Sequence, residues 1–409
     1  MSIEIRPPLT DEEWEQHCFI SAYAFDGDRG ETGTARRSKY YERSWALSAF
    51  DDGQIAAGMM VIPFEQYLNG ARIPLGGVAS VSCLPERRRG GYVGALLRRS
   101  LETMREAGQP LSALWTPHPS LYRRFGWEMA ARMVGYAFPP KVTHVRRPAE
   151  RGRWERLTPD DWPRFDAIYT QHHQARNGGM TRNEQRWRWN VFEDYAAGKV
   201  RDAAIWANDA GQPRGYVIYS TRTRSAATFP FVETLLQVHD WAALDAAAYA
   251  AVLTYLLNHD LASRITMLAS QDDPLPDALE EPVHLSEPPG AWFGIMLRLV
   301  DVQRAIEARP ALPQASGKGV TIALTDRAAP WNAGTWRIGA SEGRMSAERT
   351  TTAPDLEMDV CALAPIYNGF TRPAEAVRTG SVSAASDDAI AAATELFAST
   401  YSPYCPDDF

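Results

Sequence analysis

The segment from residue 77 to residue 107 restricts the fold of this chain more than any other part. The apolar stretch Gly77–Leu84 predicts a strand, and the basic, glycine-containing loop Arg87–Gly91 follows it. Apolar residues then recur at the helical period from about Gly91 to Ala107, which predicts an amphipathic helix. A helix N-terminus exposes backbone N–H groups and the positive end of the helix dipole, which suit a phosphate group. The order therefore predicts an α/β domain that binds an anion where the strand leads into the helix.

The residues of this loop suit a pyrophosphate. Gly90 and Gly91 have no Cβ, so a phosphate can approach the backbone closely. Arg87, Arg88 and Arg89 add positive charge, also for a 3′-phosphate. The loop has neither the ending of a P-loop nor the glycine spacing of a dinucleotide fold, which disfavours nucleoside triphosphates and NAD. On the residues alone, a surface loop whose arginines form ion pairs stays an open alternative.

The length of the chain, 409 residues, favours two or three domains. A proline- and arginine-rich linker at Pro139–Arg153 is followed by a unit that repeats the order hairpin, strand, helix and strand. A second break, Gln271–Gly290, is rich in Pro, Asp and Glu and precedes a third unit, which begins with the strand Trp292–Leu299. The expected domains are 1–145, 146–288 and 289–409.

Composition excludes several classes of protein. The net charge of −7 argues against a nucleic-acid partner. The sequence shows no apolar run of membrane-spanning length and no signal peptide. The four cysteines show no CxxC pair or Cys/His cluster, so neither a metal site nor a disulfide framework is expected. We therefore expect a cytoplasmic protein with no metal and no membrane partner.

Two segments resemble a known family. The run Arg87–Tyr92 resembles motif A of the GNAT superfamily of N-acetyltransferases, with Tyr92 in place of the last small residue of that motif. The run Leu121–Trp127 resembles the Tyr-x-Arg-Phe-Gly-aromatic segment of the enhanced-intracellular-survival (Eis) branch. The segment Ala364–Phe370, the total length and the terminal phenylalanine are also similar to that branch.

This resemblance implies an α/β (α+β) architecture of two tandem GNAT-like domains followed by a sterol-carrier-protein-like domain. The second domain is expected to be catalytically silent, because its equivalent of the phosphate loop, near Val238–Ala243, has no glycine and no arginine. The resemblance also implies a homohexamer that uses acetyl-CoA as cosubstrate. Its acceptor would be an amino group of a cationic small molecule, aminoglycoside- or polyamine-like, or of lysine. The residues implied in acetyl-CoA binding are Val81, Ser82 and Cys83 for the pantetheine, and Arg88, Arg89, Gly90, Gly91, Tyr92 and Val93 for the pyrophosphate.

Acetyl transfer requires that the amine lose a proton and that the leaving thiolate gain one. Tyr122 matches the general acid of the family, and a tyrosine is protonated at neutral pH. The family's base is the carboxylate of the last residue, which Phe409 would supply here. Asp26 and Asp408 are expected to attract a cationic substrate. Pro117-His118 replaces the Ser-Glu pair that the family usually carries before the tyrosine.

Three further expectations follow from the residues. The tail is aromatic, with Tyr401, Tyr404 and Phe409, and an aromatic tail is expected to be docked. Cys83 is not expected to form a covalent acyl-enzyme, because no histidine partner is evident. The alternative function is a carrier of lipids or other apolar ligands that uses the C-terminal domain.

Overall fold

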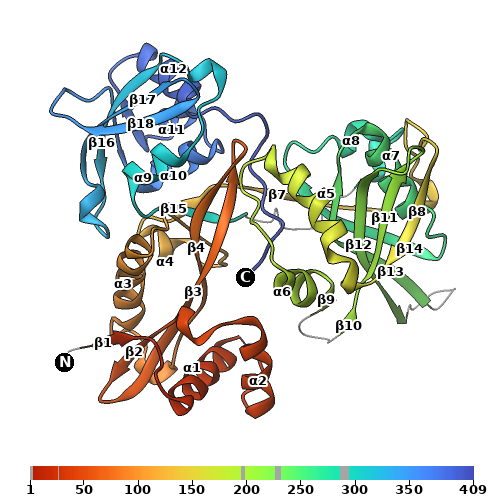
Figure 1. The fold of residues 1–409 in the computed structure, drawn as a ribbon, viewed down its shortest axis with the longest axis horizontal. Helices are drawn as coiled ribbons and strands as arrows, with labels where there is room; N and C mark the ends of the chain where they lie inside the picture. The colour runs from red at the N-terminus through yellow and green to blue at the C-terminus, as the bar shows by residue number, and fades with distance from the viewer. Residues whose placement is uncertain (1–2, 26, 195–198, 226–231, 286–293) are drawn as a thin grey trace. The chain divides into compact units, whose positions relative to one another are not determined.

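The computed structural model describes residues 3–25, 27–194, 199–225, 232–285 and 294–409 (Figure 1). The described residues form two compact units. Unit 1 comprises Met1–Ala131, Gly294–Pro403 and Asp407–Phe409, and unit 2 comprises Arg132–Phe293 and Tyr404–Pro406. The chain therefore leaves unit 1 twice and returns to it twice.

The N-terminal part of unit 1 is built on a mixed sheet with the order β1-β2-β3-β4-β5-β15-β6. Its long central strands, β3 and β4, are joined by a tight hairpin at Asn69 and Gly70, which both have positive φ. Strand β4 runs parallel to β5, and helix α3 (Tyr92–Glu106) connects the two. The strands are β1 (Glu4–Arg6), β2 (Ala46–Asp51), β3 (Gln54–Leu68), β4 (Ala71–Cys83), β5 (Leu111–Leu114), β6 (Glu128–Met129) and β15 (Met296–Leu299).

Helices cover both faces of this sheet. Helix α1 (Asp11–Ala24) packs on one face, with α2 (Glu31–Tyr40) against it, and α3 packs on the other. Successive residues of β3 alternate between the two faces, so that Met60 packs with the residues of α1 and Met59 with those of α3. Two separate apolar cores therefore enclose the strands.

Strands β15 (Met296–Leu299) and β7 (Met133–Phe138) each belong to the sheet of their own unit. Strand β15 lies between β5 and β6 in the sheet of unit 1, whereas β7 (Met133–Phe138) pairs with a strand of unit 2. The expected division of the chain places Trp292–Leu299 at the start of the third domain and Met133–Phe138 within the first. Residues 292 and 293 lie outside the described residues. A short apolar run does not reveal which sheet it joins, so the periodicity of the sequence could not predict the partners of β15 and β7.

The C-terminal part of unit 1 has its own sheet, with the order β18-β17-β16-β19-β20. The buried Arg309 guanidinium donates hydrogen bonds to the carbonyls of Tyr367, Leu396 and Ala398, which ties its helices together. The elements are α9 (Val302–Ala308), β16 (Gly319–Thr325), β17 (Gly334–Ser341), β18 (Arg344–Arg349), β19 (Leu356–Asp359), α10 (Val360–Asn368), α11 (Pro373–Arg378), β20 (Val382–Ala384) and α12 (Asp387–Leu396).

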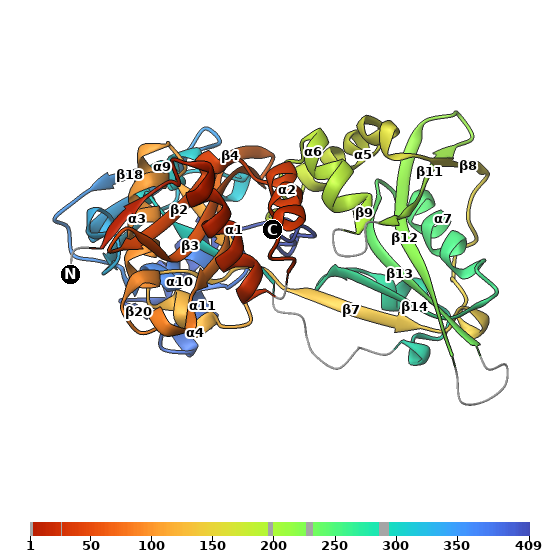
Figure 2. The ribbon, with the colours of Figure 1, turned by 90° about the horizontal axis from the view of Figure 1, so that it is seen from below.

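Unit 2 is a second mixed sheet, with the order β7-β14-β13-β12-β11-β8, and β7 is its edge strand beside β14 (Figure 2). Helices α5 and α7 pack on opposite faces, since Tyr216 of β12 contacts Phe165 of α5 and the next residue, Val217, packs with Val252 of α7. The elements are β8 (Gly152–Leu157), α5 (Trp162–Gln174), α6 (Glu184–Arg186), β9 (Glu193–Asp194), β10 (Lys199–Val200), β11 (Asp202–Asn208), β12 (Pro213–Ser225), β13 (Val232–Ala243), α7 (Ala246–Leu257), β14 (Ala262–Ser270) and α8 (Leu275–Ala278).

The three larger sheets and their helices confirm the predicted mixed α/β class. Among the described residues, no helix is both long and apolar enough to cross a membrane. In the same part of the chain, no three His, Cys, Asp or Glu side chains are grouped so that they could hold a metal ion.

Candidate active site

Strands β4 and β5 diverge, and this divergence opens the candidate site. They pair only where Leu75–Gly77 faces Leu111–Ala113. Beyond Gly77, β4 contains a bulge at Ser80, which has a φ of 53° and shifts the register with β3. No strand of the described chain pairs with Val81–Cys83 on the side that β5 has left. An extended ligand can therefore form backbone hydrogen bonds along this edge.

The open edge leads to the N-terminus of α3. Gly91 is the N-cap residue, with a φ of 86° and no side chain to cap the first N–H groups. A Cβ at Gly91 would meet nothing within 4 Å, so the space in front of the helix is open. Arg88 and Arg89 are exposed beside it. Such a geometry suits an anion such as a pyrophosphate.

Gly90 and Tyr92, the residues on either side of Gly91, stabilise the loop from within. A Cβ at Gly90 would lie 2.5 Å from the ring of Tyr92, so glycine is required by that ring. The Tyr92 hydroxyl donates a hydrogen bond of 2.7 Å to the buried carboxylate of Asp51, and Arg87 contacts the same oxygen at 2.5 Å. Tyr92 therefore points inward, and only its backbone faces an anion. Asp51 was missed because Asp52-Gly53 suggested only a hairpin.

Tyr122 lies on α4 (Pro119–Arg123), inside the same core as Val81, Cys83 and Tyr92. It is 8% exposed, and burial raises the pKa of its phenol to about 12. Its ring lies edge-on to Trp127, with 6.4 Å between centroids. The hydroxyl has no hydrogen-bond partner among the described residues. Tyr122 is thus a protonated phenol whose proton is available to a ligand.

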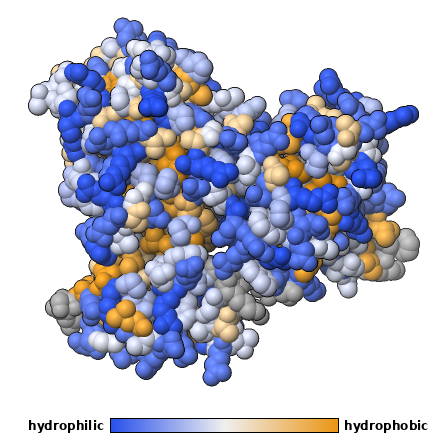
Figure 3. All heavy atoms as spheres, in the orientation of Figure 1, coloured by the Kyte–Doolittle hydropathy of each residue, from blue (hydrophilic) through white to orange (hydrophobic). Residues whose placement is uncertain are grey.

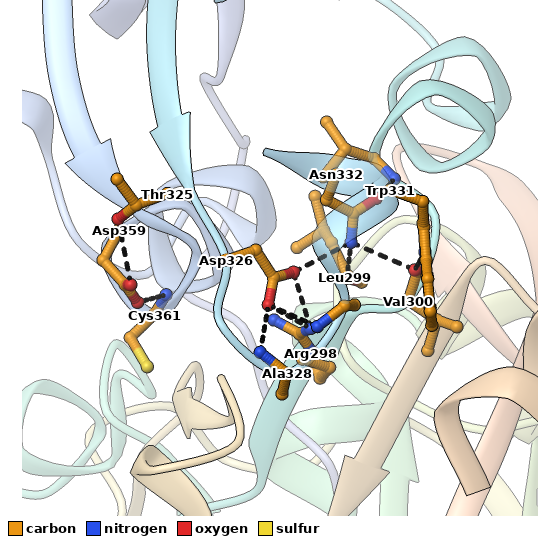
Figure 4. A network of polar contacts seen from close by, with 12 residues as sticks. Arg298, Leu299, Val300, Thr325, Asp326, Ala328, Trp331, Asn332, Asp359 and Cys361 are labelled. Carbon is orange, nitrogen blue, oxygen red and sulfur yellow. Dashed lines mark hydrogen bonds and ion pairs between the residues drawn. The ribbon is translucent and has the colours of Figure 1, made fainter. Parts of the chain in front are cut away.

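The turn after Tyr122 is held by the C-terminal part of unit 1. Gly126 has a φ of 93°, and a Cβ there would lie 2.0 Å from the guanidinium of Arg298. Arg298 is fully buried and forms an ion pair of 2.6 Å with Asp326 (Figure 4). The Cys361 thiol also donates to the carbonyl of Arg123, at 3.3 Å. Residues distant in sequence therefore fix the segment that carries Tyr122.

Asp326 is the centre of this polar network (Figure 4). Its carboxylate accepts hydrogen bonds from the backbone N–H of Ala329 at 2.9 Å and from the Asn332 side chain at 3.0 Å. Asn332 in turn donates to the carbonyl of Val300, directly after β15. The network thus joins the N-terminal sheet to the C-terminal domain.

The end of the chain lies at the fork between β4 and β5. The ring of Phe409 lies 4.9 Å from that of Phe64, and a Cβ at Gly77 would be 2.8 Å from the Phe409 ring. The indole N–H of Trp115, the first residue after β5, donates to the carbonyl of Asp407 at 2.6 Å. Gly77 is also the last residue of β4 that pairs with β5. The expectation of a docked tail is confirmed at Phe409, whereas Tyr401 is 42% exposed.

The predicted substrate carboxylates differ in what is seen of them. Asp408 is exposed, next to Phe409, whereas Asp26 lies outside the described residues. A cavity of about 480 Å³ lies between α1 and α2 and reaches Leu84, the residue after β4. The charged residues that line it are Glu15, Glu31 and Arg29. The face drawn in Figure 3 carries apolar side chains over β3 and β4.

Three further side chains, Cys83, His17 and His118, carry groups that can titrate. Burial raises the pKa of the Cys83 thiol, which keeps it protonated and supports the rejection of an acyl-enzyme. His17 of α1, which the sequence did not single out, is buried against Gly58 of β3 and hydrogen-bonds Ser48 through Nδ1 at 2.9 Å. Its pKa is lowered to about 4, by burial and then by Arg37. His118 is exposed at the start of α4.

Comparison with protein families identifies the class of the domains. The acetyltransferase (GNAT) domain matches residues 4–130, and a second acetyltransferase (GNAT) model matches residues 178–299. The sterol carrier protein domain matches residues 302–406. The protein is a GNAT N-acetyltransferase with the predicted arrangement of two GNAT domains and a sterol-carrier-like domain.

Whole-chain relatives define the branch. An uncharacterized N-acetyltransferase of Streptomyces coelicolor is 29% identical over 350 residues, 83% of this chain and 82% of its own. The N-acetyltransferase Eis of Mycobacterium tuberculosis is 24% identical over 394 residues, 91% of each chain. The crystal structure of Eis1 from Mycobacterium abscessus, 28% identical, superposes with a TM-score of 0.84 over 99% of this chain and 100% of that one. Over most of its length the chain is thus similar to Eis-like GNAT N-acetyltransferases.

Proposed function

We propose that this N-acetyltransferase takes its acetyl group from acetyl-CoA bound along the open edge of β4. The pantetheine would pair with the backbone of Val81–Cys83, and the pyrophosphate would meet the N–H groups of Gly91, Tyr92 and Val93. Arg88 and Arg89 would add charge-assisted contacts. The observation that carries this proposal is the continuity of the unpaired edge with the uncapped N-terminus of α3.

In the proposed reaction, a neutral amine attacks the thioester carbonyl carbon, so that a C–N bond forms as the C–S bond breaks. The Tyr122 hydroxyl gives its proton to the leaving thiolate. The carboxylate of Phe409 accepts the proton that the amine nitrogen must lose, directly or through one water. The position of Phe409 at the fork supports this role, because its ring contacts Gly77 where β4 and β5 part.

The proposed acceptor is an amine of a cationic small molecule, aminoglycoside- or polyamine-like, or of lysine. In the cavity beside Leu84, Glu15 and Glu31 outnumber the one lining arginine, Arg29, and this excess of negative charge supports a cationic acceptor. Asp408 is proposed to contribute from the tail, and Asp26 is proposed to contribute as well.

Release of thiol from acetyl-CoA, measured with a polyamine, an aminoglycoside and a blocked lysine, tests this proposal. We expect steady turnover with the polycations. The double substitution Glu15→Gln and Glu31→Gln should raise the KM for the cationic acceptor and leave the KM for acetyl-CoA unchanged. Absence of thiol release with every amine would contradict the proposal.

We further propose that the division 1–145, 146–288 and 289–409 corresponds to a catalytic domain, a silent GNAT-like domain and a domain that delivers the tail. Silence of the second domain is supported by Asp245, which caps α7 by accepting the Ala248 N–H at 2.8 Å. A carboxylate at this helix start repels a phosphate, whereas Gly91 leaves α3 open.

The lipid-carrier alternative is not favoured. The C-terminal domain has the guanidinium of Arg309 in its interior, bound to three backbone carbonyls, which suits a packed core better than an apolar ligand site. The family resemblance supports two further proposals, a homohexamer and a cytoplasmic location. Light scattering on the purified protein tests the first.

A further inference from the structure

In unit 2, the parallel strands β13 and β14 stop pairing after a few residues, as β4 and β5 do in unit 1. Strand β13 is bulged near His239, and it pairs with β14 only as far as Gln237 and Thr266. The space beyond is bridged, because the indole N–H of Trp241 donates to the carbonyl of Leu268 on β14 at 3.0 Å. Together with the capped α7, this bridge leaves the described part of unit 2 without an open cofactor edge of the kind seen in unit 1.

Unit 2 instead binds a segment of the C-terminal tail. The backbone N–H of Tyr404 donates to the carbonyl of Asn177 at 2.8 Å, and its ring stacks on His173 with 6.0 Å between centroids. Tyr404 is 9% exposed, and the next residue, Cys405, is fully buried. The tail is therefore seated in unit 2 immediately before Asp407–Phe409, which belong to unit 1.

Gly178 makes this seat possible. Its φ of 109° disfavours any residue with a side chain, and a Cβ there would lie 2.9 Å from the carbonyl oxygen of Tyr404. A backbone atom of the tail is the obstacle, so the clash cannot be relieved by turning a side chain. The glycine thus allows the tail backbone to lie directly on the unit.

We infer that unit 2 is the anchor of the tail, and that Tyr404 and Gly178 are positioning residues for the Phe409 carboxylate. The inference rests on the proposed role of that carboxylate as base. A base acts only within hydrogen-bond reach of the proton that it accepts. The rate therefore depends on the fraction of time that the Phe409 carboxylate spends within this reach. Anchoring at Tyr404 leaves only a short tether to Phe409, which restricts where the carboxylate can go.

The test compares two glycines of unit 2 that both have positive φ. Gly178→Ala places a methyl group against the tail, whereas Gly211→Ala, at a φ of 76°, meets nothing within 4 Å and reports backbone strain alone. We expect Gly178→Ala to lower kcat by roughly tenfold, to leave CoA affinity unchanged, and to speed maleimide labelling of buried Cys405, mapped by mass spectrometry. Gly211→Ala should show neither effect.

A second pair tests the ring. Tyr404→Phe retains the stacking and the backbone hydrogen bond and should keep kcat, whereas Tyr404→Ala should behave like Gly178→Ala. Wild-type kcat in both Gly178→Ala and Tyr404→Ala would overturn the anchor. Deletion of Phe409, assayed in parallel, separates the two ideas. If deletion of Phe409 lowers kcat but Gly178→Ala and Tyr404→Ala do not, only the anchor is refuted. If deletion of Phe409 leaves kcat unchanged, the base is refuted and the anchor with it.

Discussion

Tyr92 and Tyr122 are buried to the same extent in one core, yet their hydroxyls have different surroundings. The Tyr92 hydroxyl donates a hydrogen bond to Asp51, which raises the pKa of the phenol and fixes its ring over Gly90. Tyr122 has no such partner, and burial alone raises its pKa. At the scale of the residue, this difference separates a structural phenol from one that can give a proton to a thiolate.

Tyr122→Phe should lower kcat by about 10²–10⁴-fold, the usual contribution of a general acid. The fold should persist because the ring keeps its edge contact with Trp127. Steady-state kinetics and CoA calorimetry check this, with Tyr255→Phe in unit 2 as a control that also removes one phenol hydroxyl. A Tyr122→Phe enzyme with full kcat would show that another group protonates the thiolate.

Arg88→Glu combined with Gly91→Glu should weaken CoA binding by about tenfold or more, since a charge-assisted hydrogen bond contributes about 1.5–3 kcal/mol. The added side chain would also fill the open space in front of α3. Calorimetry with CoA measures the effect. Arg72→Glu, at the far end of β4, is the control for a reversed charge. Equal CoA affinities for the double variant and the wild type would contradict the assignment of this loop as the phosphate-binding site.

At the scale of the element, local signals were sufficient for α3 but not for β15. The helix predicted from Gly91 to Ala107 is observed from Tyr92 to Glu106, because its apolar face and flanking glycines are local features. The pairing of β15 with β5 depends on residues almost two hundred positions apart, which no local pattern reports. The docking of the tail was predictable from its aromatic residues, whereas its seat against Gly178 was not.

The ion pair between Arg298 and Asp326 is predicted to hold the elements around Tyr122. Asp326→Asn would leave the buried guanidinium without its counter-charge, which costs about 3–5 kcal/mol. We expect a clear fall in melting temperature together with a lowered kcat, because the turn at Gly126 loses its support. Glu102→Gln, which breaks an exposed pair with Arg99, should change stability by about 1 kcal/mol or less. Similar melting temperatures for the two variants would contradict the assignment.

At the scale of the whole molecule, buried neutral histidines link stability to pH. The pKa of His17 is about 4 in the folded protein and near 6.5 when it is unfolded, so only the unfolded chain binds a proton between these values. Stability should therefore fall as the pH drops from about 6.5 to about 4, by on the order of 3 kcal/mol from His17. Melting temperatures across this range should decline less steeply for His17→Asn. An unchanged slope would mean that His17 does not contribute.

In the tail, three consecutive residues belong to unit 2 and the last three to unit 1. We propose that the carboxylate of Phe409, whose ring lies at the fork of β4 and β5, is the base. The most direct measurement is kcat and CoA affinity for two matched proteins, one with two glycines added after Phe409 and one with two glycines added before Met1. The account predicts that the C-terminal addition lowers kcat by about 10²-fold or more while CoA affinity persists, and that the N-terminal addition changes neither. Full activity in the C-terminally extended protein would contradict it.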